Sequence, residues 1–159
     1  MECDKFARKA MKYAHLIKLT VFSHEDEDKD SISRSLPEFF PFSLDSNEVP
    51  VKKTRAEGFN ESKIEMFEVT LTKTNLINQF LKGLLEKMDE GQKITILEQA
   101  ESRLGKNLDF FVRFDKASWI NEKKLVLTDS GKCFHLKISI AAFPKKRGVA
   151  LKAIKDLFS

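Results

Sequence analysis

The chain has 159 residues, of which 42% are apolar and 33% are charged. This length suits one domain spanning residues 1–159, and the composition excludes a disordered chain. No run of about 18 apolar residues occurs, and the start of the chain lacks the apolar segment of an export signal, so we expect a cytoplasmic protein without membrane contact. Two cysteines, Cys3 and Cys133, are too few for a disulfide framework, which fits a reducing compartment.

Positive charge is concentrated in the last third of the chain. Residues 104–159 hold 12 Lys or Arg and 5 Asp or Glu, whereas residues 1–103 hold 16 and 19. The net charge of +4 is therefore +7 on the C-terminal part and −3 on the rest. A basic surface on such a domain is the electrostatic footprint of a phosphate-rich partner, so nucleic acid is the leading candidate.

The first 62 residues predict one strand and one helix, followed by a long connection. Apolar and polar residues alternate over residues 14–22, which is typical of a half-buried strand. The acidic run 25–28 predicts the first turns of a helix, because carboxylates are favoured at the positive end of the helix dipole, and Pro37 ends it. Three further breakers within residues 38–62 indicate a long connection with one extended segment near residues 51–56.

The middle of the chain predicts a strand and two helices. Residues 63–72 alternate, and the apolar spacing then changes to helical. From Leu76 to Met88 apolar residues recur at i, i+3 and i+4, which indicates an amphipathic helix. A second helix carries Ile94 and Leu104 on one apolar face, and Gly105 is its expected C-terminal cap.

The last third predicts three strands and a final helix. Residues 108–115 alternate as a strand. A short strand at 124–128 and the turn at 129–131 favour a β-hairpin into a strand over residues 133–143. Pro144 is expected to open the last helix.

Together these elements predict an α+β fold in the form of a two-layer sandwich. Its mostly antiparallel sheet has four to five strands, and the helices cover one face. The other face is open to solvent or to a partner. By their parity along the strands, the residues on this open face are Lys18, Phe111, Arg113, His135 and Lys137.

Cations at the ends of these elements are candidate phosphate contacts, because long side chains there reach outward. Ordinary solubilising charge is the alternative explanation. The cations of the PKKR segment stand at a helix start, which the dipole disfavours, and this favours an external ligand. Phe111 is the candidate base-stacking platform, with a second apolar layer or a subunit interface as the alternative. The candidate RNA-binding residues are Arg113, Lys116, Lys123, Lys124, Lys145, Lys146, Arg147, Phe111, Lys137 and Lys18.

No motif predicts a metal, a cofactor or catalysis. The aspartates at positions 26, 28 and 30 open like a calcium loop, but its sixth and twelfth positions lack the required Gly and Glu. Cys133 and His135 share a strand face, without further ligands at zinc spacing. Because no glycine-rich phosphate loop or nucleophile elbow occurs, we expect no cofactor and no enzyme.

Several segments, spread over most of the chain, resemble those of one family. They are R-x-D-K at 113–116, LVLTD at 125–129, PKKR at 144–147, VFSHEDED at 21–28, AEGF at 56–59 and FEVTLTK at 67–73. The family that they resemble is the archaeal family of predicted RNA-binding exosome subunits. The resemblance implies a fold similar to that of the ribosomal protein that binds 5S ribosomal RNA, and neither catalysis nor a cofactor. One departure follows AEGF, where the family's Gly-Asn-Pro turn is replaced by Asn60-Glu61-Ser62.

The sequence therefore predicts an RNA-binding protein that acts as an accessory factor in RNA processing or degradation. The resemblance adds the exosome, or other RNA-processing proteins, as partners. Affinity is expected to come from phosphate contacts along the basic C-terminal part, with modest sequence preference. The alternative is a protein-interaction or homodimerisation module that does not bind RNA directly, and an enzyme comes third.

Overall fold

The computed structural model describes residues 12–57, 63–129 and 131–159. Cys3, Ser130 in the predicted turn, and the segment 58–62, which includes the end of AEGF and the departure after it, lie outside the described residues. The described elements are, in chain order, β1 (Ala14–Ser23), α1 (Lys29–Ser35), the 3-10 helix η1 (Pro37–Phe39), β2 (Lys52–Glu57), β3 (Lys63–Leu71), α2 (Thr74–Lys87), α3 (Glu90–Glu98), α4 (Ala100–Arg103), β4 (Asp109–Asp115), α5 (Lys116–Glu122), β5 (Cys133–Ile140) and α6 (Arg147–Phe158).

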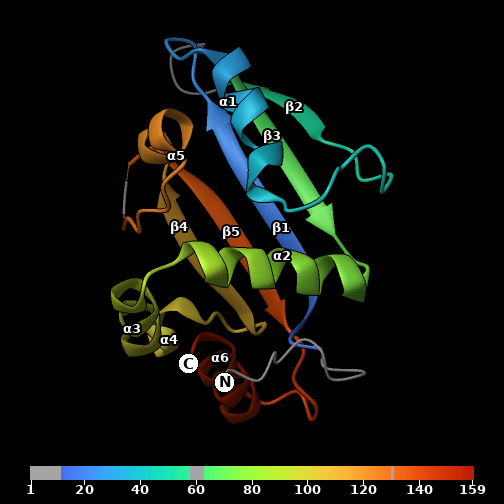
Figure 1. Cartoon of the computed structure of the whole chain (residues 1–159), viewed down its shortest axis with the longest axis vertical. Coiled ribbons are helices and arrows are strands. Elements are labelled where there is room, and N and C mark those ends of the chain that lie inside the picture. Colours follow the sequence, from blue (N-terminus) through green and yellow to red (C-terminus); the bar gives the residue numbers. More distant parts are fainter. Residues whose placement is uncertain (1–11, 58–62, 130) are drawn as a thin grey trace.

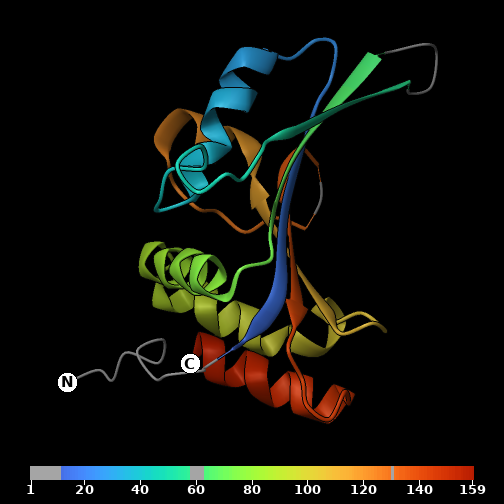
Figure 2. The same cartoon turned by 90° about the vertical axis from the view of Figure 1, so that its right-hand side faces the viewer.

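Five strands form one antiparallel sheet in the order β2-β3-β1-β5-β4. Helix α2 crosses the sheet on one side, and α1 and α5 lie above it on the same side, as Figures 1 and 2 show. Helix α6 lies at the lower end of the sheet, where it packs on α3 and α4. The predicted α+β class with helices on one face is confirmed.

The core lies between the sheet and this helical layer. Every second residue of the central strands points into it, such as Ile17, Leu19 and Val21 of β1. From the helical side, α2 contributes the buried side chains predicted from its spacing, including Ile77, Phe80 and Leu84. Because only one side of each strand is covered, the other side keeps polar residues, as the alternation requires.

Helix α1 begins three to four residues later than the acidic run suggests. Asp28 is the N-cap, and its carboxylate accepts hydrogen bonds from the N–H groups of Asp30 and Ser31. This local bond fixes the helix start, because it satisfies backbone donors that have no partner within the helix. Glu27 stays outside the helix and contacts Lys116 instead.

The predicted helix over Ile94–Leu104 is broken at Gln99 into α3 and α4, and the predicted cap at Gly105 is wrong. Leu104 is already extended, and the left-handed residue of the following turn is Leu108, with φ of 64°. Gly105 serves a different purpose, because a Cβ at this position would lie 3.3 Å from Cε2 of Phe111.

The predicted hairpin between residues 124–128 and β5 does not form. Both edges of β5 are occupied, by β1 and β4. The segment lies instead along the free edge of β4, where the Asp115 N–H donates to the Val126 carbonyl and the Thr128 N–H to the Arg113 carbonyl. Alternation along a strand does not specify which edge it pairs with, so the sequence could not resolve this choice.

The last helix also begins later than predicted. Pro144 lies in the connection between β5 and α6, and Lys146 is the N-cap of α6. Strand β5 ends at Ile140 rather than at Phe143. The last residues of the predicted strand, including Phe143, therefore lie in a loop.

Ile138 is fully buried in β5 between β1 and β4. We expect Ile138→Ala to lower the free energy of unfolding by roughly 2–5 kcal/mol, because the change leaves a cavity in a packed core. The matched control is Thr20→Ala, on the open side of β1, with an expected loss below about 1 kcal/mol. Urea unfolding of both variants measures the difference, and equal losses would contradict the one-sided core.

Candidate nucleic-acid interface

The strand register brings four of the predicted RNA-binding residues together on the open side of the sheet. Lys18 of β1 lies opposite Lys137 of β5, which lies opposite Phe111 of β4. The next row contains Thr20, His135 and Arg113 in the same order. We call these six residues the basic face. Because β1 and β4 come from opposite ends of the sequence, only strand pairing assembles it.

The basic face places two lysines, Lys18 and Lys137, at directly paired positions on neighbouring strands. Like charges directly opposite each other on neighbouring strands destabilise a sheet, so this arrangement costs free energy without a ligand. Lys18 lies 3.8 Å from Glu68 of β3. Lys137 has no carboxylate within 4 Å among the described residues. The face therefore presents cationic charge that the protein only partly neutralises.

Several cations elsewhere in the described parts of the chain are paired with carboxylates. On the covered side, Glu65 of β3 contacts Lys29, Lys53 and Arg55 at 3.6, 3.5 and 3.4 Å. Such pairs turn their charge inward and leave less of it for a partner. The contrast with Lys137 makes the basic face the better candidate for an anionic ligand.

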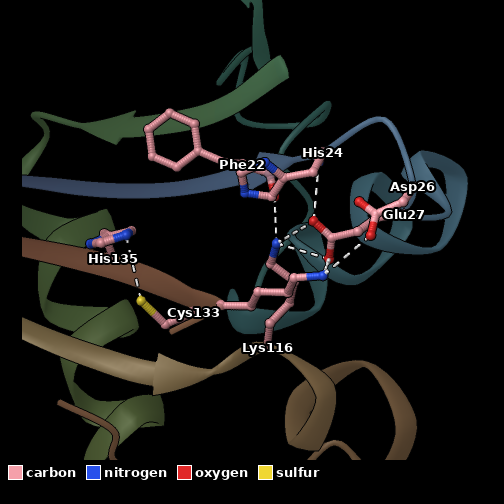
Figure 3. A network of polar contacts seen from close by, with 8 residues as sticks. Phe22, His24, Asp26, Glu27, Lys116, Cys133 and His135 are labelled. Atoms are coloured by element: carbon pink, nitrogen blue, oxygen red, sulfur yellow. Dashed lines mark hydrogen bonds and ion pairs between the residues drawn. The ribbon is translucent and has the colours of Figure 1, made fainter. Parts of the chain in front are cut away.

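Lys116, one of the predicted phosphate contacts, does not belong to the basic face. It is 4% exposed, and its ammonium donates to the Phe22 carbonyl and to both Glu27 carboxylate oxygens, at 3.1 and 3.2 Å (Figure 3). We call this arrangement the Lys116–Glu27 clip. It joins the start of α5 to the loop after β1, so this cation holds the fold together and cannot reach a phosphate.

The clip also determines the charge state of its carboxylate. Burial raises the pKa of Glu27, but a hydrogen bond from the His24 N–H, the Lys116 contacts and the Lys132 charge outweigh it, so the pKa is lowered. Glu27 is therefore ionised at neutral pH, and the clip is an ion pair.

Three further predicted residues lie away from the basic face. Arg147 donates to the carbonyls of Leu104 and Glu101, so it binds the C-terminal end of α4, where cations are favoured. This internal contact explains a cation at the start of α6 without an external ligand. Lys123, in a left-handed conformation at the end of α5, lies 3.2 Å from Glu38. Lys124 is exposed on the segment beside β4.

The remaining two, Lys145 and Lys146, are exposed in the connection between β5 and α6. This connection lies at the lower end of the sheet and reaches toward its open side (Figure 2). Phe143, in the same connection, is 98% exposed. The sequence analysis did not single out Phe143. A signal was available, because in the predicted strand over residues 133–143 the odd-numbered residues, such as Lys137, face outward.

Cys133 and His135 lie on the same side of β5, as their spacing predicts. Cys133 Sγ lies 3.4 Å from His135 Nε2 (Figure 3). Burial raises the pKa of the Cys133 thiol. Burial also lowers the pKa of the His135 imidazole, and the Arg113 and Lys116 charges lower it further. Both groups are therefore neutral at pH 7, and the contact does not produce the thiolate that a cysteine nucleophile requires.

Among the described residues, no three or more His, Cys, Asp or Glu side chains gather as a metal ion would require. No helix in the described ranges is both long and apolar enough to cross a membrane.

Comparison with known families identifies the chain's relatives. Residues 16–140 match the family described as RNA binding. The chain belongs to this family. The match begins in β1 and ends in β5, so it includes every strand that contributes to the basic face.

Relatives in this RNA-binding family come from archaea. The RNA-binding protein PAB1135 of Pyrococcus abyssi is 25% identical over 144 residues, which cover 90% of this chain and 92% of that protein. A crystal structure of the DUF54 protein AF2318 from Archaeoglobus fulgidus superposes with a TM-score of 0.81 at 26% identity, covering 91% of this chain and 99% of that one. The crystal structure of the DUF54 protein SSO0741 from Sulfolobus solfataricus superposes with a TM-score of 0.72 at 29% identity, covering 90% of this chain and 96% of that one.

We expect Lys116→Met to lower the free energy of unfolding by about 3 kcal/mol, because it leaves the Glu27 carboxylate buried without its partner. Glu27→Gln keeps the acceptor for the His24 N–H while it removes the charge. The double variant should therefore lose clearly less than the sum of the two single losses. Urea unfolding of the four proteins tests the clip, and strictly additive losses would contradict it.

The lowered pKa of His135 predicts a pH dependence of stability. Its ordinary value is 6.5, and the unfolded chain takes up the proton at higher pH than the folded one. The contribution to stability is therefore full above pH 6.5 and is lost as the pH falls through the lowered folded-state pKa. His135→Gln should flatten the curve in this window, whereas the control Thr20→Ala, an uncharged residue in the same row of the basic face, should keep the pH dependence of the parent. Parallel curves for parent and His135→Gln would contradict this assignment.

Proposed function

We propose that the protein binds RNA through the basic face. The observation that carries this proposal is the juxtaposition of Lys18 and Lys137 on an open sheet, beside Arg113 and Phe111. Phosphate groups relieve the repulsion between the two ammonium groups, and each contact releases counterions from the RNA. Membership of the RNA-binding family, and the name of the Pyrococcus abyssi relative, support the same partner.

The mode of binding follows from the kinds of group on the surface. Cations at the ends of flexible side chains bind the phosphate backbone and carry little sequence information. Exposed aromatic rings add contacts with unstacked bases, which are available in single strands and loops but not inside an RNA duplex. Phe111 on the basic face and Phe143 beside Lys145 and Lys146 are two such rings. This combination favours single-stranded or looped RNA with modest sequence preference.

The wider role that we propose is that of a cytoplasmic accessory factor in RNA processing or degradation, acting by binding and not by catalysis. The resemblance to predicted exosome subunits is its basis, and the likeness to the ribosomal protein that binds 5S ribosomal RNA also stays a prediction. The neutral Cys133–His135 contact, which lacks an activated thiol, supports binding over catalysis.

A surface for protein–protein contact is the second candidate, because Phe111 and Phe143 are exposed apolar side chains. In this case the protein would elute as a dimer on sizing, and the charge on the basic face would not matter for function. The two candidates differ in their salt dependence, since counterion release is specific to a polyanionic partner.

For about four phosphate contacts on single-stranded RNA, we expect log affinity to fall against log salt concentration with a slope of about −3. The double variant Lys18→Gln/Lys137→Gln should weaken binding about tenfold at low salt and make the slope shallower by about 1.4. Stability should hold or rise slightly, because the repulsion across the strands is removed.

The matched control removes two charges from the covered side, with Lys73→Gln/Lys82→Gln at the start and on the exposed side of α2. We expect this control to keep the parent slope. Fluorescence anisotropy with labelled RNA measures both. Absence of binding at low salt, or equal slopes for the two double variants, would rule out the basic face as the RNA site.

A further inference from the structure

A pocket of about 390 Å³ lies beside the basic face, between the edge strand β4 and α4. Its lining consists of Gln99, Ser102, Arg103, Phe111, Arg113 and Asp129. Phe111 and Arg113 also belong to the basic face, so the pocket opens on the same side of the sheet as Lys137. Four of the lining residues are absent from the predicted RNA-binding residues, namely Gln99, Ser102, Arg103 and Asp129.

Both guanidinium groups are fixed in place by neutral partners. Arg103 donates to Gln99 Oε1 through Nε and Nη2, at 3.0 and 2.6 Å, and to the Phe111 carbonyl through Nη1 at 3.3 Å. Arg113 donates to the Asp129 carbonyl at 2.9 Å. An arginine has five N–H donors. Hydrogen bonds to the described residues use only some of them, so both arginines keep N–H donors for a ligand.

Neither arginine forms an ion pair with a carboxylate among the described residues. Burial lowers the pKa of Arg103, and the Arg113 charge lowers it further, whereas the Asp129 charge raises it. The lining thus holds two guanidinium groups and one carboxylate, that of Asp129, so a net positive charge remains. Amide and carbonyl oxygens hold the two guanidinium groups in place. A bound anion would relieve their repulsion, and a phosphate matches the fork of a guanidinium group.

The third wall of the pocket is the ring of Phe111, which is 45% exposed. Gly105 lies beside this ring, and because a Cβ at this position would be 3.3 Å from Cε2, the absence of a side chain leaves room for the ring. The pocket thus combines an aromatic surface, two anchored guanidinium groups, and the amide and hydroxyl of Gln99 and Ser102. A nucleotide has the matching parts, namely a flat base, a phosphate, and polar base edges.

We infer that this pocket binds one unpaired nucleotide of an RNA strand, its base stacked on Phe111 and its phosphate between Arg103 and Arg113. The inference rests on the proposed function and assigns to the pocket a preference for single-stranded over duplex RNA. A base in a duplex is stacked on both sides and cannot offer its plane to Phe111.

The experiment compares binding of a short single-stranded RNA and of the same RNA annealed to its complement. Phe111→Leu keeps an apolar side chain but removes the aromatic plane, so affinity for the single strand should fall about 5- to 100-fold. Affinity for the duplex should stay unchanged. Phe111→Tyr should restore single-strand binding to within about twofold, because stacking tolerates any aromatic ring. Arg103→Lys keeps the charge but loses the fork, and it should also weaken single-strand binding.

The control is Ile94→Ala, which removes another exposed apolar side chain, on α3 and outside the pocket. We expect no change in affinity for this variant. If Phe111→Leu binds the single strand like the parent while Lys18→Gln/Lys137→Gln is weakened, the nucleotide pocket is wrong and the RNA-binding face stands. If the parent binds neither RNA at low salt, both proposals fail. Displacement of the single strand by a phosphotyrosyl peptide, but not by nucleoside monophosphates, would overturn the choice of ligand.

Discussion

The antiparallel pairing of β1 with β3 on one edge and β5 on the other is the constraint on which the rest of the structure depends. Side chains alternate between the two faces of a strand, so the register fixes both the core and the open face at once. The pairing that places Leu19 beside Leu136 in the core also places Lys18 beside Lys137 on the surface. A slip of either strand by one residue would turn the lysine of that strand toward the core, and the free-energy cost of burying an unpaired charge disfavours this.

The helices act on this sheet from one side, and they use charge differently from the open face. In the Lys116–Glu27 clip and in the Arg147 contacts with α4, the cations hold elements of the fold together. Removing either partner of a buried pair is costly, so such residues are poorly suited to an exchangeable ligand. On the open face Lys18 contacts Glu68, whereas Lys137 lies beside Lys18 and Phe111 without a carboxylate within 4 Å among the described residues. The Lys and Arg that hold elements together and those that we propose to bind RNA are therefore separate sets.

The edge of the sheet combines the two uses. Arg103 and Arg113 are anchored by hydrogen bonds, as structural residues are, but their anchors are neutral and leave the charge in place. Anchoring reduces the conformational entropy lost when a ligand binds. In the proposed nucleotide pocket, the two anchored guanidinium groups would therefore lose less conformational entropy on binding than the flexible lysines of the open face.

The sequence by itself determined the fold class and the parity of each strand. Alternation placed Lys18, Phe111, Arg113, His135 and Lys137 on one face before any pairing was known, because the side-chain period of a strand is local. It also located α2, whose apolar spacing depends only on the helical repeat. Composition showed where positive charge is concentrated along the chain. These properties need no information about distant segments.

Tertiary structure decided which cations are available. Lys116 and Arg147 look like free surface cations in the sequence. Contacts with segments far away in the chain, Glu27 for Lys116 and the end of α4 for Arg147, give them internal partners. The edge at which residues 124–128 pair, and the pocket between α4 and β4, likewise depend on how separate elements meet. Local patterns specify the face on which a side chain lies. Local patterns do not specify the neighbours of a side chain, because these neighbours come from segments that are far away in the sequence.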